Sequence, residues 1–266
     1  MLTRIISGFI LAVMLILALL FLPQKVILYV VAVVAVAGLY EFYKANFGKD
    51  KLFLKLIGYA MGVGLMFLPK AYTAAMLTFG LMAALLLTVL LYKKINFKDA
   101  AEAFFGVIYV FGLLKYIYLT RAENGGKFLV FAIFIGAFFT DIGAYFTGML
   151  LGKHKLTAIS PKKTVEGAVG GVIMTLIAFL VYAFVGYYYM HYKINILNLL
   201  VTGAVLAVCS ELGDLAASVI KREVGIKDYG NIIPGHGGIL DRIDSVLFTA
   251  PIFYYLNLVL PIFIIK

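Results

Sequence analysis

The chain has 266 residues, of which 64% are hydrophobic and 14% are charged, and its formal net charge is +10. A soluble globular domain is about half apolar and about a quarter charged, so this composition excludes an ordinary soluble domain. The single cysteine, Cys209, excludes an intrachain disulfide. We therefore expect an integral membrane protein.

Apolar runs long enough to cross a hydrocarbon core of about 30 Å recur along the chain. They predict nine transmembrane helices, at residues 5–22, 26–43, 52–68, 71–92, 100–120, 128–151, 167–190, 194–217 and 245–265. The third run is short and carries Lys55, and the fifth carries Glu102 and Lys115. The predicted fold class is an all-α polytopic integral membrane protein with about nine transmembrane helices.

The distribution of cations predicts the orientation of these helices. With nine spans, the N-terminus and the even-numbered loops carry 15 of the 23 lysines and arginines, and the opposite side carries 6. The positive-inside rule then places the N-terminus in the cytoplasm. We expect most loop lysines to mark topology, with contact to anionic lipid as an alternative, and we expect no nucleic-acid partner.

The two halves of the chain differ in their polar content. The few acids of the first 127 residues lie mostly at the ends of predicted spans. We therefore predict that residues 1–127 form a transmembrane scaffold and that residues 128–266 form a transmembrane catalytic region with cytoplasmic loops. In the second region, Gly167 and Gly171 form a small-xxx-small pair, which predicts close helix packing.

Asp141 lies inside an apolar run, with Tyr145 and Gly148 on the same helix face. A carboxylate at membrane depth is costly, and it usually faces a polar cavity or a partner. Asp141 is therefore a candidate catalytic residue. The alternative is a buried pair with Lys115 of the fifth span.

A basic segment precedes the seventh predicted span. Ser160 is suited to an N-cap and Pro161 to the first helical position. Lys162 and Lys163 would then lie at a helix N-terminus, where backbone N–H groups and ammonium charges favour phosphate. Glu166 follows in the same segment. The alternative is an ordinary capped helix start whose lysines only mark topology.

A polar stripe marks the end of the eighth predicted span. Glu211, Asp214 and Ser218 recur at helical spacing, and Lys221 or Arg222 continues the stripe. The carboxylates and the hydroxyl are oxygen ligands of the kind that Mg²⁺ prefers, and the cations could hold phosphate oxygens. The alternative is a stripe that is neutralised internally between helices.

A glycine-rich loop follows, in which residues 234–238 read Pro-Gly-His-Gly-Gly. Glycine allows the backbone to approach a ligand closely, and His236 would bind phosphate or organise the loop. Asp241 and Asp244 point the same way at a helix start, and with Asp214 they could complete a metal site. Together these features predict metal-assisted phosphate chemistry at the cytoplasmic face.

The segment 218–244 resembles the signature of the CDP-diacylglycerol synthases, also called phosphatidate cytidylyltransferases. The matching positions are Ser218, Lys221, Arg222, Lys227, Asp228, Gly230, Pro234, His236, Gly237, Gly238, Asp241, Arg242 and Asp244. Two upstream segments, 141–145 and 160–167, are also similar to those of the family. The resemblance is strong over roughly residues 130–250.

The resemblance implies that CTP and phosphatidic acid react, with Mg²⁺ and a second cation such as K⁺, to give CDP-diacylglycerol and pyrophosphate. It implies a homodimer, and we expect a multi-pass protein of the cell inner (plasma) membrane, in contact with membrane lipids, whose active site faces the cytoplasm. The candidate catalytic residues are Asp141, Lys163, Glu166, Ser218, Lys221, Arg222, His236 and Arg242. The candidate substrate-binding residues are Lys162, Lys227, Gly237 and Gly238, and the candidate metal ligands are Asp214, Asp241 and Asp244.

Two other functions are alternatives to this one. A CTP-dependent polyprenol or lipid kinase would move the γ-phosphoryl group to a neutral hydroxyl, which needs a base. An ion-coupled transporter would use Asp141, Glu211 and Asp214 as an ion path. Such transporters more often carry broken helices in two repeats, whereas the polar residues of this chain crowd into one half.

Overall fold

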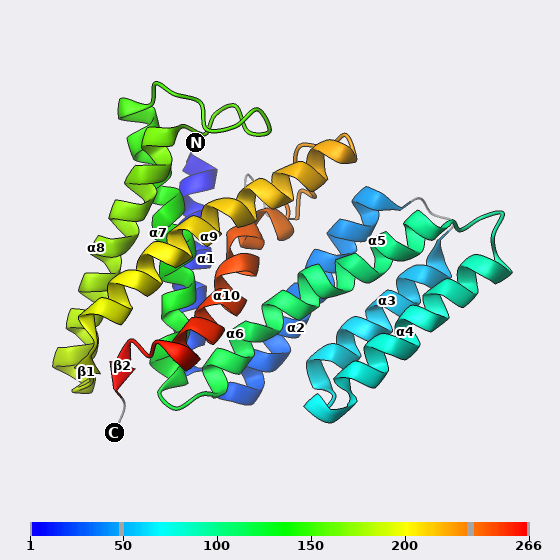
Figure 1. Cartoon of the computed structure of the whole chain (residues 1–266), viewed down its shortest axis with the longest axis horizontal. Coiled ribbons are helices and arrows are strands. Elements are labelled where there is room, and N and C mark those ends of the chain that lie inside the picture. The colour runs from blue at the N-terminus through cyan, green and yellow to red at the C-terminus, as the bar shows by residue number, and fades with distance from the viewer. Residues whose placement is uncertain (1, 48–50, 233–236, 265–266) are drawn as a thin grey trace. The chain divides into compact units, whose positions relative to one another are not determined.

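The computed structural model describes residues 2–47, 51–232 and 237–264. Its helices are α1 (Leu2–Phe21), α2 (Gln24–Asn46), α3 (Leu52–Phe67), α4 (Lys70–Leu90), α5 (Phe97–Val107), the π-helix η1 (Ile108–Gly112), α6 (Leu113–Ala122), α7 (Gly126–Leu151), α8 (Val165–Met190), α9 (Ile196–Glu223) and α10 (Leu240–Val259). Two short strands, β1 (Lys193–Ile194) and β2 (Phe263–Ile264), pair antiparallel. Figure 1 shows this arrangement, in which α5, η1 and α6 follow one another without a break.

Each of the nine predicted apolar runs overlaps a helical segment in the described part of the chain, but the ninth, predicted to reach residue 265, stops being helical at Val259 and is followed by β2. Within that part, six helical segments are long and apolar enough to cross a membrane: α2, α4 from Ala71, the α5–α6 segment, α7, α8 and α9. Residues Gly8–Phe21 of α1 and the whole of α3 form shorter apolar helices. The protein is therefore an all-α polytopic membrane protein, and the number of nine crossings stays a prediction.

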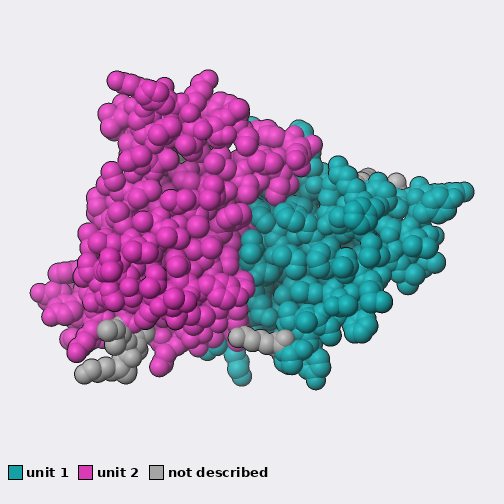
Figure 2. Space-filling view, in the orientation of Figure 1, with its two compact units in different colours: residues 1–16, 22–115, 224–242 teal, residues 17–21, 116–223, 243–266 magenta. Residues whose placement is uncertain are grey.

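By its internal contacts the chain divides into two compact units, which Figure 2 shows in teal and magenta. The first unit contains residues 1–16, 22–115 and 224–242, and the second contains residues 17–21, 116–223 and 243–266. Residues 224–232 and 237–242, which flank or end the glycine-rich loop, therefore pack with helices of the first half of the sequence. The predicted division at residue 127 concerns where the chemistry lies, and it stays a prediction.

In the first unit, aromatic side chains of α2 pack against small residues of α5. Phe42 and Tyr43 are both buried. A Cβ atom added at Gly106 would lie 2.7 Å from the ring of Phe42, so this position accepts no side chain at the present helix separation. The hydroxyl of Tyr43 donates to the carbonyl of Ala103 at 2.9 Å. These contacts fix α2 against α5.

In the second unit, α7 and α8 lie side by side (Figure 1). Glycines of both helices line the contact. A Cβ atom at Gly143 would lie 2.8 Å from the carbonyl oxygen of Gly170, and one at Gly171 would lie 2.9 Å from that of Thr140. One at Gly167 would also lie 2.8 Å from a carbonyl oxygen of α7. The predicted close packing at Gly167 and Gly171 is therefore confirmed.

The start of α8 differs from the prediction. Thr164 is the N-cap, and its hydroxyl accepts a backbone N–H of the first turn at 3.0 Å. Pro161 lies in a four-residue turn that a 3.0 Å hydrogen bond to the carbonyl of Ser160 closes, and proline is favoured at the second position of such a turn. The backbone of 154–156 pairs with that of 163–165, so the chain reverses here instead of forming a helix. The assignment of Ser160 as N-cap and Pro161 as first helical residue is wrong.

Gly143→Ala should destabilise the second unit, because the new Cβ atom would lie 2.6 Å from the Cβ atom of Met174. Overpacking of this kind typically costs about 1–3 kcal/mol. We expect the midpoint of thermal unfolding in detergent micelles to fall by about 2–4 °C for each kcal/mol. Gly112→Ala is the control, since its nearest neighbour would be 3.6 Å away, which is an ordinary contact. Equal shifts for the two variants would contradict the tight packing of α7 on α8.

Candidate functional site

A cluster of carboxylate and ammonium groups lies in the second unit, and Lys163 is bonded to two of its acids. The Lys163 Nζ atom lies 2.6 Å from Oε2 of Glu211 and 2.6 Å from Oδ2 of Asp214. The two acids share a face of α9, and Lys163 comes from the turn before α8. Burial lowers the pKa of the Lys163 ammonium, but Asp214 and Glu211 raise it more, so this pKa ends above its usual value. Lys163 is therefore a cation at neutral pH.

Asp141 of α7 and Asp244 of α10 complete the cluster. The Oδ2 atom of Asp141 accepts the hydroxyl of Ser245 at 3.2 Å, and Asp141 interacts electrostatically with Asp214. Asp244 is only 7% exposed, and its Oδ1 atom accepts the N–H of Ser245 at 2.9 Å. Asp244 also interacts electrostatically with Asp214 and with Lys221. Three helices and one turn thus bring charged groups together.

The polar stripe predicted on α9 is confirmed as a shared face. Glu211, Ser218 and Lys221 are buried and Asp214 is half-buried, as expected for side chains on the packed side of the helix. The helix continues to Glu223, beyond the predicted end of its span at residue 217. Arg222 is exposed, so the buried cation of the stripe is Lys221.

The side chains of the cluster are of the kind that could bind a metal ion. Its carboxylates come from Asp141, Glu211, Asp214 and Asp244, and its ammonium groups come from Lys163 and Lys221. Its four carboxyl groups outnumber its two ammonium groups. Carboxyl oxygens are donors that fit a hard divalent cation such as Mg²⁺. In residues 2–47, 51–232 and 237–264, however, no group of three or more His, Cys, Asp or Glu side chains is already placed to hold one.

Asp241 bonds to backbone groups of the first unit on both sides of residues 233–236, at Tyr229 and Gly238. It lies in the first turn of α10, as predicted, and its Oδ2 atom accepts the N–H of Tyr229 at 2.8 Å and that of Gly238 at 3.1 Å. Gly237 has φ +82°, in the left-handed region that favours glycine. A carboxylate can accept several bonds, so these contacts leave room for the predicted metal-ligand role of Asp241, which stays a prediction.

Glu41 was not among the predicted site residues, yet it contacts the same loop. Its side chain is buried in the first unit, and its two oxygens accept the N–H groups of Ile239 at 3.0 Å and Leu240 at 2.8 Å. The signal that could have found it is a glutamate inside the apolar run 26–43, since such a residue needs a polar partner.

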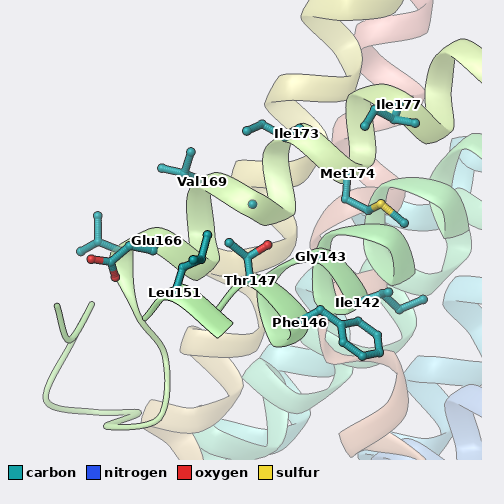
Figure 3. Close-up of a pocket in the computed structure, with 12 residues that line it drawn as sticks. Ile142, Gly143, Phe146, Thr147, Leu151, Glu166, Val169, Ile173, Met174 and Ile177 are labelled. Atoms are coloured by element: carbon teal, nitrogen blue, oxygen red, sulfur yellow. The ribbon is translucent and has the colours of Figure 1, made fainter. Parts of the chain in front are cut away.

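Glu166 lies outside the carboxylate cluster and holds the loop after α7. Its Oε1 atom lies 2.6 Å from Nδ1 of His154, and its Oε2 atom accepts the backbone N–H groups of Lys153 and His154. Figure 3 shows Glu166 at the edge of an otherwise largely apolar groove of about 530 Å³, which side chains of α7 and α8 line. The contacts of Glu166 connect this loop to the first turn of α8, and its predicted catalytic role stays a prediction.

The other predicted residues are placed as follows. The side chains of Lys162, Lys227 and Arg242 are exposed. His236 lies outside the described residues. The roles of these four residues stay predictions.

Comparison with known proteins gives two findings. A sequence model described as the cytidylyltransferase family matches residues 2–260. Over 166 residues the chain is 44% identical to a phosphatidate cytidylyltransferase of Staphylococcus haemolyticus, 45% identical to one of Staphylococcus saprophyticus and 42% identical to one of Staphylococcus aureus. Each alignment covers 62% of this chain and 62% of the relative, so the chain spans less than two thirds of the relatives' length.

Lys163→Met should destabilise the second unit, because it leaves Glu211 and Asp214 facing each other without the ammonium between them. Removing one partner of a buried ion pair typically costs about 3–5 kcal/mol. The Lys163 side chain is 20% exposed, so we expect the lower part of that range. Lys162→Met is the matched control, and a surface substitution of this kind usually changes stability by less than about 0.5 kcal/mol. Thermal unfolding in micelles measures both, and equal losses would exclude the ion pair as a stabilising contact.

Proposed function

Because the chain belongs to the cytidylyltransferase family, we propose that it transfers the cytidylyl group of CTP to phosphatidic acid, giving CDP-diacylglycerol and pyrophosphate. The relatives named phosphatidate cytidylyltransferase support this choice of substrates, since they are 42–45% identical over the aligned residues. The structural observation that carries the proposal is the cluster of four carboxylates and two ammonium groups in the second unit. Such a cluster suits a reaction between phosphates that are bound with metal ions.

The proposed step is a displacement at phosphorus. An ionised oxygen of phosphatidate attacks the α-phosphorus of CTP, and a new oxygen–phosphorus bond forms. The bond from the α-phosphorus to the oxygen that bridges to the β-phosphorus breaks, and pyrophosphate leaves with that electron pair. A phosphate monoester is ionised at neutral pH, so no side chain has to remove a proton from the nucleophile. The protein has to align the two phosphates and neutralise their charge.

Lys163 and Lys221 are the cations of the cluster that we propose for this task. Ammonium groups form short, charge-assisted bonds with phosphate oxygens. The contacts of Lys163 with Glu211 and Asp214 restrict its side chain before any substrate binds, which lowers the entropy cost of aligning it. Arg222 and Arg242 are exposed, and we propose that they meet the triphosphate from the aqueous side.

We propose that Asp214 and Asp244 hold Mg²⁺, with Asp141 or Ser218 as a further ligand. The carboxyl oxygens that these acids bring together in the second unit support this assignment. When bound, a divalent ion neutralises charge that develops on the phosphates and aligns nucleophile and leaving group. The metal-ligand role of Asp241, which lies in the first unit, stays a prediction from the sequence. A second cation such as K⁺ would bind the same class of oxygen donors.

We also propose that the N-terminus and the active site face the cytoplasm and that the protein resides in the plasma membrane. The support is the excess of lysines and arginines, 15 against 6, on the side of the N-terminus and the even-numbered loops. In this orientation CTP arrives from the cytoplasm, and phosphatidate arrives laterally from the bilayer. The proposed homodimer rests on the family resemblance alone.

The test is an assay of purified protein in mixed micelles with CTP labelled on the α-phosphate, phosphatidic acid and Mg²⁺. We expect label in the lipid phase, and loss of that label when EDTA removes the metal, because phosphate charge is then no longer neutralised. A γ-label that enters the lipid, with CDP as the other product, would instead indicate a lipid kinase. Ion flux in proteoliposomes without any nucleotide would support a transporter.

Asp214→Asn and Asp244→Asn should each lower turnover at least about 10²-fold, because each removes a charge that stabilises the reacting groups. The proteins should remain folded, as thermal unfolding in micelles will show. Glu102→Gln is the control, since Glu102 forms an ion pair with Lys98 at 3.6 Å on α5, with the lysine side chain largely exposed. Near-normal turnover of either aspartate variant would remove that residue from the metal site.

A further inference from the structure

Glu41 is among the most buried charged side chains in the described part of the chain, with 1% of its surface exposed. A carboxylate in such surroundings is very costly unless donors satisfy it. Both of its oxygens are used: Oε1 accepts the N–H of Ile239, and Oε2 accepts the N–H of Leu240. These donors lie nearly two hundred positions away in the sequence and at the start of α10.

The first N–H groups of a helix have no partner within the helix, and an acid near them is favoured by the helix dipole. A side chain of the same segment usually supplies this cap. Here the acid comes from α2, so Glu41 caps α10 from another helix of the first unit. Its charge-assisted bonds fix the place where the glycine-rich loop becomes a helix.

The glycines of the loop are shaped around the same carboxylate. A Cβ atom at Gly238 would lie 2.6 Å from Oε2 and 2.7 Å from Oε1 of Glu41. One at Gly230 would overlap Oε1 of Glu41 and lie 3.0 Å from its Cδ atom. Neither glycine has a positive φ, so space for Glu41, and not backbone conformation, accounts for the missing side chains.

We propose that Glu41 is a positioning residue: it holds the backbone of residues 229–232 and 237–241 in the shape with which these residues bind the triphosphate of CTP. The proposal rests on the proposed function. It goes beyond that function because it assigns a part in substrate binding to the half of the chain that the sequence indicated to be scaffold. In this role Glu41 acts through the backbone groups of Ile239 and Leu240 that it bonds.

Steady-state kinetics of Glu41→Ala test the proposal. A displaced loop should raise KM for CTP at least about tenfold and leave KM for phosphatidic acid within about twofold, since misplaced binding groups lower reactivity sharply. Glu41→Gln keeps the shape of the side chain but leaves it with one acceptor oxygen in place of two. We therefore expect a smaller increase in KM for CTP than in Glu41→Ala. A purely structural role would reduce the amount of folded enzyme, which lowers apparent kcat and leaves both KM values unchanged. That result would overturn the proposal.

Glu102→Ala is the matched control, since it also removes a glutamate of the first unit, one that lies in a partly exposed pair with Lys98. An exposed pair of this kind contributes little, so both KM values should stay within about twofold of those of the unchanged protein. An increase in KM for CTP equal to that of Glu41→Ala would show that any lost glutamate has this effect, and it would refute the specific role of Glu41.

A double-mutant cycle with Gly230→Ala tests whether the loop and Glu41 act together. The three atoms nearest to the added methyl group would all belong to Glu41. Gly230→Ala alone should therefore displace the carboxylate and raise KM for CTP. In the Glu41→Ala background the same change should add less than about twofold, because residues in contact do not act independently. Fully additive effects would show that Gly230 acts without Glu41, against the proposal.

Two further readouts do not require turnover. Amide hydrogen exchange on the full chain in micelles should become faster in peptides that cover residues 237–242 in Glu41→Ala, and it should not change in α8. The same variant should bind CTP more weakly at equilibrium. Unchanged exchange or unchanged CTP binding would refute the positioning role. A protein that binds CTP in this way but makes no CDP-lipid would refute only the proposed reaction.

Discussion

A carboxylate that is removed from water must be bonded to donors or cations, and this requirement organises both units of the protein. In the second unit the partner of the carboxylates is a cation: Lys163, from the turn before α8, bonds to Glu211 and Asp214. In the first unit the solution uses the main chain: Glu41 and Asp241 accept N–H groups of the loop and of the start of α10. The ionic cluster keeps charge available for phosphate and metal, whereas the main-chain contacts fix a shape.

These polar contacts depend on helices that approach closely. Apolar side chains have no preference for one another over lipid, so helix association in a bilayer relies on close packing. Gly143, Gly167 and Gly171 allow α7 and α8 to touch along their backbones. Asp141 and Glu166 lie on these two helices, and their positions therefore depend on this close contact.

The features that could be predicted well from the sequence depend on a simple length or a simple repeat. Bilayer thickness sets the length of apolar runs, so the positions of the helices could be predicted. Helical spacing placed Glu211, Ser218 and Lys221 on one face, which the burial of all three confirms. The sequence left open whether Lys221 or Arg222 continues the buried stripe, because the predicted span stopped at residue 217. The structure decides for Lys221, because α9 continues to Glu223.

The features that the sequence missed depend on particular turns or on distant partners. A Ser-Pro pair suits both a helix start and a tight turn, and the backbone pairing of residues 154–156 with 163–165 decides for the turn. Glu41 gave a weak signal because its partners, Ile239 and Leu240, lie at the other end of the chain. The roles of the candidate site residues in chemistry remain predictions, since charge and proximity restrict a reaction class without identifying each ligand.

The dependence of Gly230 and Gly238 on Glu41 has a consequence for how such sequences change over time. The loop is contiguous in the chain, yet the space it requires is defined by a residue encoded nearly two hundred codons earlier. A larger residue at either glycine becomes tolerable only after the acid has shortened or moved, so the order in which substitutions accumulate is constrained. For the same reason the segment is not a transplantable module: grafted into another polytopic protein, it would arrive without the partner around which it is folded.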